Sequence, residues 1–347
     1  MITQDRLLKY GYLLLPFCLV GNQTFATGQY YALMTAIMAG VGLCVTDKWL
    51  RGFLLYFALW QAALWASSLL FVRSIILAPN GFEMYATTTL LVLLWAYVSK
   101  SEKDDEWFFN IFCIGALIQA VIAWFQVFDI QLYKMVPSPI VAIKSQMGNA
   151  ITAMLQNNNF LAGFIAISTP FFFRRRWIYF LPLILPLFWP MQTRTAVIAL
   201  CAGIAFYYRR HWKIILPISI SAAIAFMLTT RGLPTETGPE TRWDMWGKAL
   251  MFMFSDWSRL LAGNSPGIVL DGNLHNEYLT LFMKFGFAGL AFLAGYLWNL
   301  PRIHRILSTA MVVALVNMMG NYAMELPTTM ALITCIAGLL ERHRCRK

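Results

Sequence analysis

Apolar segments that approach or reach the thickness of a bilayer recur along the whole chain, and short groups of charged residues separate them. A helix needs roughly 17 to 25 mostly apolar residues to cross a membrane. The pattern therefore predicts about twelve transmembrane helices. We place them at approximately 8–22, 27–46, 52–72, 83–99, 107–128, 158–173, 177–191, 195–208, 213–230, 277–299, 306–322 and 326–340.

Composition supports this pattern. Hydrophobic residues make up 59% of the chain and charged residues 12%, with a mean hydropathy of +0.60, which excludes an ordinary soluble domain. The predicted fold class is all-α, a polytopic integral membrane protein with a single membrane domain over residues 1–347. The six cysteines fall in predicted spans or in the C-terminal tail, so we expect neither a disulfide nor a metal site.

The basic residues orient the predicted helices, because loops rich in Lys and Arg stay in the cytoplasm. With both termini inside, the inner segments contain 18 of the 27 basic residues and seven of the 16 acids, a surplus that equals the net charge of +11. The charge therefore reflects membrane orientation, and nucleic acid is not an expected partner. Residues 1–25 resemble a secretory signal, but we expect them to be retained as the first span.

Two predicted outer loops are longer than simple turns: 129–157 and the main outer loop, 231–276. In the second, Trp243, Trp246, Leu250, Phe254 and Trp257 recur at helical spacing. This spacing predicts an amphipathic helix that lies flat at the outer membrane interface. There the aromatic residues either anchor the loop or contribute to a functional site.

Several polar or charged residues lie at positions where the predicted topology does not require a polar side chain. Arg194 occupies a very short outer turn after Thr193, and Arg242 adjoins the start of the predicted outer helix, where a positive helix end favours anions. Snorkelling to lipid headgroups is the alternative for Arg194. His275 is the only histidine on the predicted outer side, and Asn276 and Glu277 follow it at a junction of loop and helix, which suits acid–base chemistry. Glu277 alternatively favours the helix dipole.

Further polar residues complete the set. Asn157, Asn158 and Asn159 either bind sugar or phosphate or form a turn and helix cap, and Lys284 either holds a phosphate or reaches the interface.

In chain order, these motifs resemble the O-antigen ligase and polymerase superfamily over roughly residues 145–295. The resemblance rests on the segments Gln156–Gly163, Thr193–Ala196, Arg242–Trp246, Leu261–Gly267, His275–Leu279 and Phe285–Leu290. It implies an enzyme without a metal or other cofactor that transfers an undecaprenyl-diphosphate-linked glycan to an acceptor on the periplasmic face of the bacterial inner membrane. Arg194 and Arg242 match the family's diphosphate-binding arginines, and His275 matches the histidine that positions or deprotonates the acceptor.

The resemblance leaves the acceptor open, since lipid A core, a growing glycan and a protein side chain correspond to a ligase, a polymerase and an oligosaccharyltransferase. Two other classes remain as alternatives. A lipid-linked sugar transporter usually shows internal repeats and ionisable groups at the bilayer midplane, which we do not find in the sequence. A scaffold without catalysis predicts that the arginines and His275 are replaceable.

Overall fold

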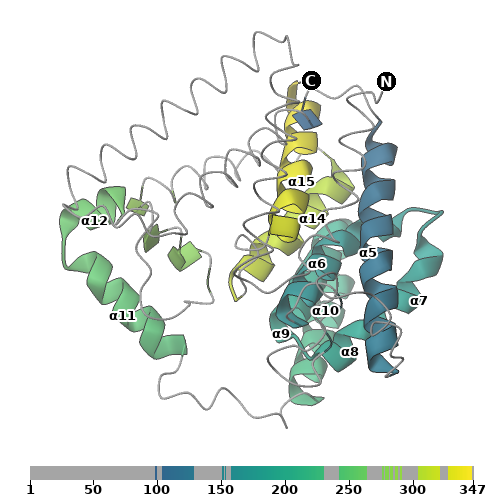
Figure 1. Ribbon diagram of the computed structural model, residues 1–347, viewed down its shortest axis with the longest axis horizontal. Helices are drawn as coiled ribbons and strands as arrows, with labels where there is room; N and C mark the ends of the chain where they lie inside the picture. The colour runs from purple at the N-terminus through teal and green to yellow at the C-terminus, as the bar shows by residue number, and fades with distance from the viewer. Residues whose placement is uncertain are drawn as a thin grey trace, which may run out of the picture.

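The computed structural model describes about half of the chain, and its regular structure is helical throughout that part (Figure 1). The described residues are 98–99, 104–128, 151, 153, 158–229, 242–263, 276, 278–280, 282–283, 286–287, 290, 304–320 and 327–345. The predicted spans at 8–22, 27–46 and 52–72, and most of those at 83–99 and 277–299, lie outside these residues. The all-α prediction is confirmed within the described ranges.

The helices follow the apolar segments closely. They are α5 (Asp105–Val127), α6 (Asn158–Ser168), η3 (Thr169–Phe173), η4 (Ile178–Phe180), α7 (Leu181–Ile184), η5 (Leu185–Leu187), α8 (Phe188–Met191), α9 (Arg194–Tyr207), η6 (Arg209–His211), α10 (Trp212–Thr229), α11 (Arg242–Phe254), α12 (Trp257–Ala262), α14 (Arg305–Met318) and α15 (Pro327–Cys345). Here η denotes a short 3₁₀ helix.

Two described helical segments are long and apolar enough to cross a membrane, Asp105–Val127 and Arg209–Thr229. Helix α10 leaves much of its apolar surface uncovered, since Ile214 is 64% exposed and Ile218 58% exposed. Water disfavours such a continuous apolar face, whereas lipid does not. Membrane association is therefore supported, while the count of twelve spans stays a prediction.

Two predicted elements differ in detail from the observed ones. The span expected at 177–191 is divided into four short helices, because Pro182, Pro186 and Pro190 each lack the N–H that a continuous helix needs. Helix α15 continues beyond the predicted end at residue 340 and includes Arg342 and His343. Those two side chains bond to Asp105 of α5. The additional turn of α15 therefore contacts a helix that is far away in the sequence.

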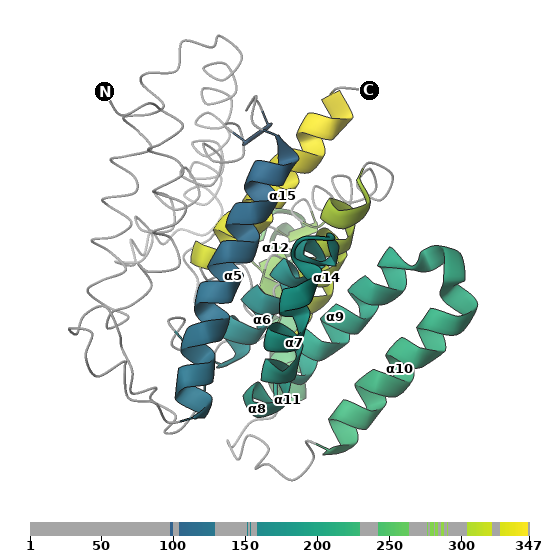
Figure 2. The same cartoon turned by 90° about the vertical axis from the view of Figure 1, so that its right-hand side faces the viewer.

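Helix α14 lies at the centre of the bundle and packs against α9, α6 and α15 (Figure 2). Two glycines allow the closest approaches. A Cβ atom on Gly203 of α9 would lie 2.3 Å from Cγ2 of Val313, and one on Gly163 of α6 would lie 2.6 Å from Nδ2 of Asn317. Small residues of this kind let helix backbones approach each other, which is how helices associate in lipid.

Contacts between the helices of the bundle can be grouped by the end of the bundle at which they lie. At the Asp105 end, contacts join Glu106 to Arg174, Asp105 to His343 and the Tyr207 carbonyl to Arg305. At the Arg194 end, contacts join Gln126 to Ala153, Asn158 to Met191 and Thr195 to Gly320. Helix α5 runs from the first end to the second and fixes the separation, since its 23 residues extend about 35 Å at the usual rise per residue.

Helices α11 and α12 lie apart from the helices around α14 (Figure 1) and belong to a second apolar cluster. Ala249 and Met253 of α11 are buried against Phe282 and Met283. Of the predicted aromatic face, Trp246 packs against this cluster, whereas Phe254 is 62% exposed. The predicted continuous helix also breaks at residues 255–256.

Candidate functional site

Arg194 is the first residue of α9, one residue earlier than the predicted start of that span. Gln192, two residues before it, adopts the left-handed backbone conformation, with a φ of 54°, and ends α8. A non-glycine residue in this conformation is uncommon and makes a sharp reversal of the chain. The reversal places the Arg194 side chain at the start of a helix rather than in a flexible turn.

The carbonyl oxygen of Met191 fixes this reversal to a second helix. It accepts hydrogen bonds from Asn158 Nδ2 at 3.1 Å and from Thr193 Oγ1 at 3.2 Å. The Asn158 Oδ1 atom accepts from the Asn159 backbone N–H at 2.9 Å. Asn158 and Thr193 thus stabilise the backbone near Arg194, and the Thr193 side chain is buried. Both were predicted to bind substrate; in this structure the polar atoms named here bond to protein.

Two helix N-termini consequently lie side by side at the Arg194 end, those of α6 and α9. Neither helix has an acidic residue in its first turn. The N–H groups of a first turn and the helix dipole create a partial positive charge, and the Arg194 guanidinium adds a full one. The local field therefore favours an anion, and phosphate oxygens match both kinds of donor.

Asn276 begins a helical turn in the segment that follows His275. Its Oδ1 accepts from the backbone N–H groups of Tyr278 at 3.0 Å and Leu279 at 3.2 Å, and its carbonyl accepts from the Thr280 N–H at 3.0 Å. This arrangement is an N-cap, one of the roles that asparagine fills best. Asn276 was expected to bind substrate, and the observed bonds of its oxygen atoms are structural.

Tyr278 ties this turn to α14. Its hydroxyl donates to the Leu315 carbonyl at 2.9 Å. In the last turn of α14 the Met319 N–H bonds to Val316 instead of Leu315, so the Leu315 carbonyl can accept from the tyrosine. The next residue, Gly320, contacts Thr195 closely enough that an added Cβ would lie 2.7 Å from its Oγ1. The end of α14 therefore holds both the Asn276 turn and the helix that begins at Arg194.

The same segment continues into the second apolar cluster and connects the bundle with α11. Leu279, Phe282 and Met283 pack against α11, whose first residue is Arg242. Gly286 passes against the end of α12 with a φ of 61°. Helix α11 is thus positioned by Leu279, Phe282 and Met283.

The structure does not describe every predicted site residue. His275, Asn157, Glu277 and Lys284 lie outside the described residues, and Arg242 is described only as the start of α11. No sequence pattern indicated that Tyr278, Gln192 and the end of α14 position the site. Tyr278 lies within the His275–Leu279 motif, but sequence alone does not indicate that its hydroxyl bonds to a segment 37 residues away.

The described fold defines a class, an all-helical protein with two helices that could cross a membrane. A scan against models of known protein families finds no match, and a search of curated proteins likewise finds none.

Proposed function

We propose that this protein is a membrane glycan transferase, most similar in action to O-antigen ligases. It moves an oligosaccharide or polysaccharide from an undecaprenyl-diphosphate donor to a hydroxyl or amide of a glycan, lipid A core or protein acceptor. The observation that carries the proposal is the Arg194 end of the bundle. There Arg194 begins α9 beside the N-terminus of α6, and the turn that Asn276 begins is held against the same end of α14.

The donor requires a site of this kind. A diphosphate leaving group gains negative charge as the bond to the sugar breaks, and cationic donors fixed in a dry site stabilise that charge. Guanidinium groups bind phosphate oxygens in paired hydrogen bonds. In the proposal Arg194 and Arg242 bind the diphosphate. The hydrogen bonds of Asn158 and Thr193 to Met191 support Arg194 by fixing the backbone beside it.

The reaction is an inverting displacement at the anomeric carbon. The acceptor atom attacks this carbon, the bond between the carbon and the diphosphate oxygen breaks, and the diphosphate keeps the electron pair. His275 orients the acceptor and takes the proton that it loses. The products are the glycosylated acceptor and undecaprenyl diphosphate, so the step requires no oxidant or reductant.

The proposed orientation places the Arg194 end at the periplasmic face of the inner membrane and the Asp105 end in the cytoplasm. The distribution of basic residues supports it, since Arg174, Arg209, Arg305 and Arg342 all lie at the Asp105 end or on η6 beside it. Inner loops carry such an excess of basic residues.

The direct test is binding of undecaprenyl diphosphate to the purified full chain, measured by native mass spectrometry. Arg194→Ala and Arg242→Ala should lose the lipid, whereas His275→Ala should retain it. Arg210→Ala is the matched control, because Arg210 is an exposed arginine of η6 and should bind normally. Equal binding by wild type and both arginine variants would refute the diphosphate site and favour the transporter or scaffold alternatives.

A turnover measurement tests the chemistry separately. Loss of one electrostatic donor in such a site typically lowers the rate by about 10²- to 10³-fold. We expect Arg194→Ala and Arg242→Ala to show a loss of this size in glycan transfer, and His275→Ala to lose transfer while still binding donor. Near-normal transfer by His275→Ala would overturn its assigned role.

A further inference from the structure

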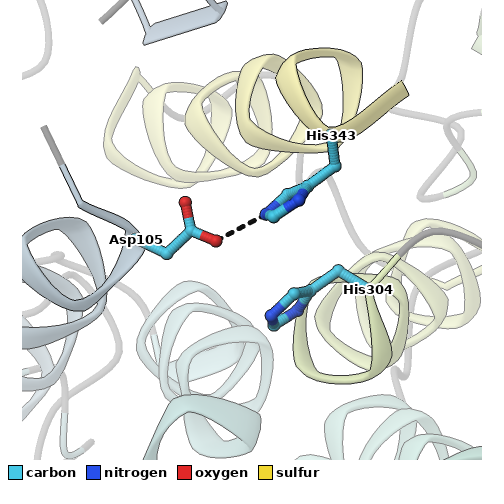
Figure 3. A group of neighbouring side chains, drawn as sticks. All are labelled: Asp105, His304 and His343. Carbon is cyan, nitrogen blue, oxygen red and sulfur yellow. Dashed lines mark hydrogen bonds and ion pairs between the residues drawn. The ribbon is translucent and has the colours of Figure 1, made fainter. Parts of the chain in front are cut away.

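Three side chains of types that can bind a metal ion meet at the Asp105 end, although they come from separate helices (Figure 3). Asp105 is the first residue of α5, His304 is the N-cap of α14, and His343 lies near the end of α15. One ligand atom from each lies within 4.8 Å of the other two. The His343 Nε2 atom is 2.5 Å from Asp105 Oδ2, and the two imidazole ring centroids are 5.0 Å apart.

We propose that Asp105, His304 and His343 bind a divalent transition-metal cation of the zinc type. Two imidazoles and one carboxylate form a ligand set that suits Zn²⁺ and Co²⁺, and a water molecule supplies the fourth ligand. Ligand atoms around tetrahedral zinc are separated by about 3.3 Å, as bond lengths near 2.0 Å require. To reach that geometry, His343 Nε2 and Asp105 Oδ2 must move apart by about an ångström from their present 2.5 Å, and His304, within 4.8 Å of both, must move closer by at most about 1.5 Å.

One feature of the surroundings favours metal binding. Arg342 bonds to Asp105 Oδ1, the other carboxylate oxygen, and so orients the group while Oδ2 faces His343. Hydrogen bonds of this kind commonly orient ligating carboxylates.

Metal binding must replace two existing interactions, the 2.5 Å contact between His343 Nε2 and Asp105 Oδ2 and a hydrogen bond to His304. The Leu307 N–H donates to His304 Nδ1 at 3.4 Å, a long bond. Coordination through Nε2 places the ring proton on Nδ1 and gives up this bond, and coordination through Nδ1 also replaces it. The Arg342 guanidinium opposes a cation at short range, so we expect reversible binding at micromolar concentrations rather than a permanently held ion.

The competing explanation is a clasp without metal, in which Arg342 and His343 simply hold Asp105 and close the bundle. Both explanations predict that the cluster stabilises the protein. Only the metal site predicts that added Co²⁺ acquires the absorption spectrum of a protein-bound ion and that added Zn²⁺ raises the unfolding temperature. The site lies at the opposite end from Arg194, so its test is independent of the proposed transferase activity.

The experiment uses the full chain in detergent, freed of any histidine tag and stripped with a chelator. We expect one equivalent of Co²⁺ to bind and to produce the visible absorption of a low-symmetry cobalt site, and Zn²⁺ to displace it. His304→Asn should weaken binding at least tenfold while keeping an N-cap acceptor for α14. His343→Asn should do the same, whereas His211→Asn is the control, because His211 is exposed on η6 outside the cluster.

A thermal unfolding series completes the test. Zn²⁺ should raise the unfolding temperature of wild type and of His211→Asn, but not of His304→Asn. Absence of stoichiometric binding by wild type overturns the proposal, as does equal binding by the His304→Asn, His343→Asn double variant. If the variants unfold at a lower temperature but Zn²⁺ does not change the unfolding temperature of wild type, the cluster is a clasp without metal. That result also refutes the proposed site.

Discussion

Gly286 offers a sharp test of how the segment after His275 is positioned. Its backbone has a φ of 61°, and a Cβ atom there would lie 2.6 Å from the Leu260 carbonyl oxygen and from the Leu261 carbonyl group. Ordinary contacts between nonbonded heavy atoms are about 3.5 to 4.0 Å. Because the neighbouring atoms are backbone, they cannot rotate away as a side chain could. We therefore expect Gly286→Ala to force α12 and this segment apart.

The expected cost has two parts. A residue with a Cβ in the left-handed region is destabilised by about 1 to 2 kcal/mol relative to glycine. Inserting a methyl group into a close contact adds about 1 to 3 kcal/mol. Gly286→Ala should therefore lower the free energy of unfolding by about 2 to 5 kcal/mol.

Gly247 in the middle of α11 is the matched control. A Cβ on Gly247 meets nothing within 4 Å, and alanine favours a helix over glycine by about 0.5 to 1 kcal/mol. The same glycine-to-alanine change should thus have opposite signs at the two positions. Titration with a denaturing detergent, followed by the fluorescence of the 13 tryptophans, measures both differences. Equal stabilities of wild type and Gly286→Ala would refute the close packing of Gly286 against α12.

Three other predictions concern the bundle and α12. Gly203→Ala should lower the free energy of unfolding by about 1 to 3 kcal/mol, because its Cβ would lie 2.3 Å from Val313 Cγ2. Adding Val313→Ala should restore part of this loss, and a double-mutant cycle with no coupling would contradict the contact. Tyr278→Phe should cost about 0.5 to 1.5 kcal/mol by leaving the Leu315 carbonyl without its donor, which the same unfolding titration measures. Hydrogen bonds from Ser258, and the nearby Arg259, lower the Asp256 pKa. The ionised Asp256 carboxylate therefore stabilises the folded protein at pH values above its ordinary pKa of 3.8. This stabilisation is lost as the pH falls through the lower pKa that Asp256 has in the folded protein. Asp256→Asn keeps an N-cap acceptor and should remove this acid sensitivity in an acid unfolding series, and an unchanged profile would contradict it.

Local sequence determined much of the secondary structure. The apolar runs that end at charged residues predicted α5, α9 and α10 to within a few residues, because helix formation depends on neighbours three and four positions apart. The repeat of large apolar residues after Arg242 likewise predicted α11. It did not predict which face is buried, since Ala249 and Met253 are covered by a segment about 30 residues further along the chain.

The sequence also singled out Arg194 as a cation at the boundary of two apolar segments. Its surroundings depend on the left-handed Gln192 and on a Met191 carbonyl that accepts from Asn158, 33 residues earlier. No local pattern specifies that bond. The tertiary structure, by packing α6 beside α9, decided that two helix N-termini share one location.

Asp105, His304 and His343 show the same division most clearly. Each sits near a helix end in the sequence, without the short spacing typical of a metal motif, and 238 positions separate Asp105 from His343. The sequence by itself determined that these segments are helices and where charged groups interrupt them, because hydrophobic burial and backbone hydrogen bonding act along each segment. Only the packing of α5, α14 and α15 brought the three side chains together, since contacts between distant segments depend on the shape of the whole core.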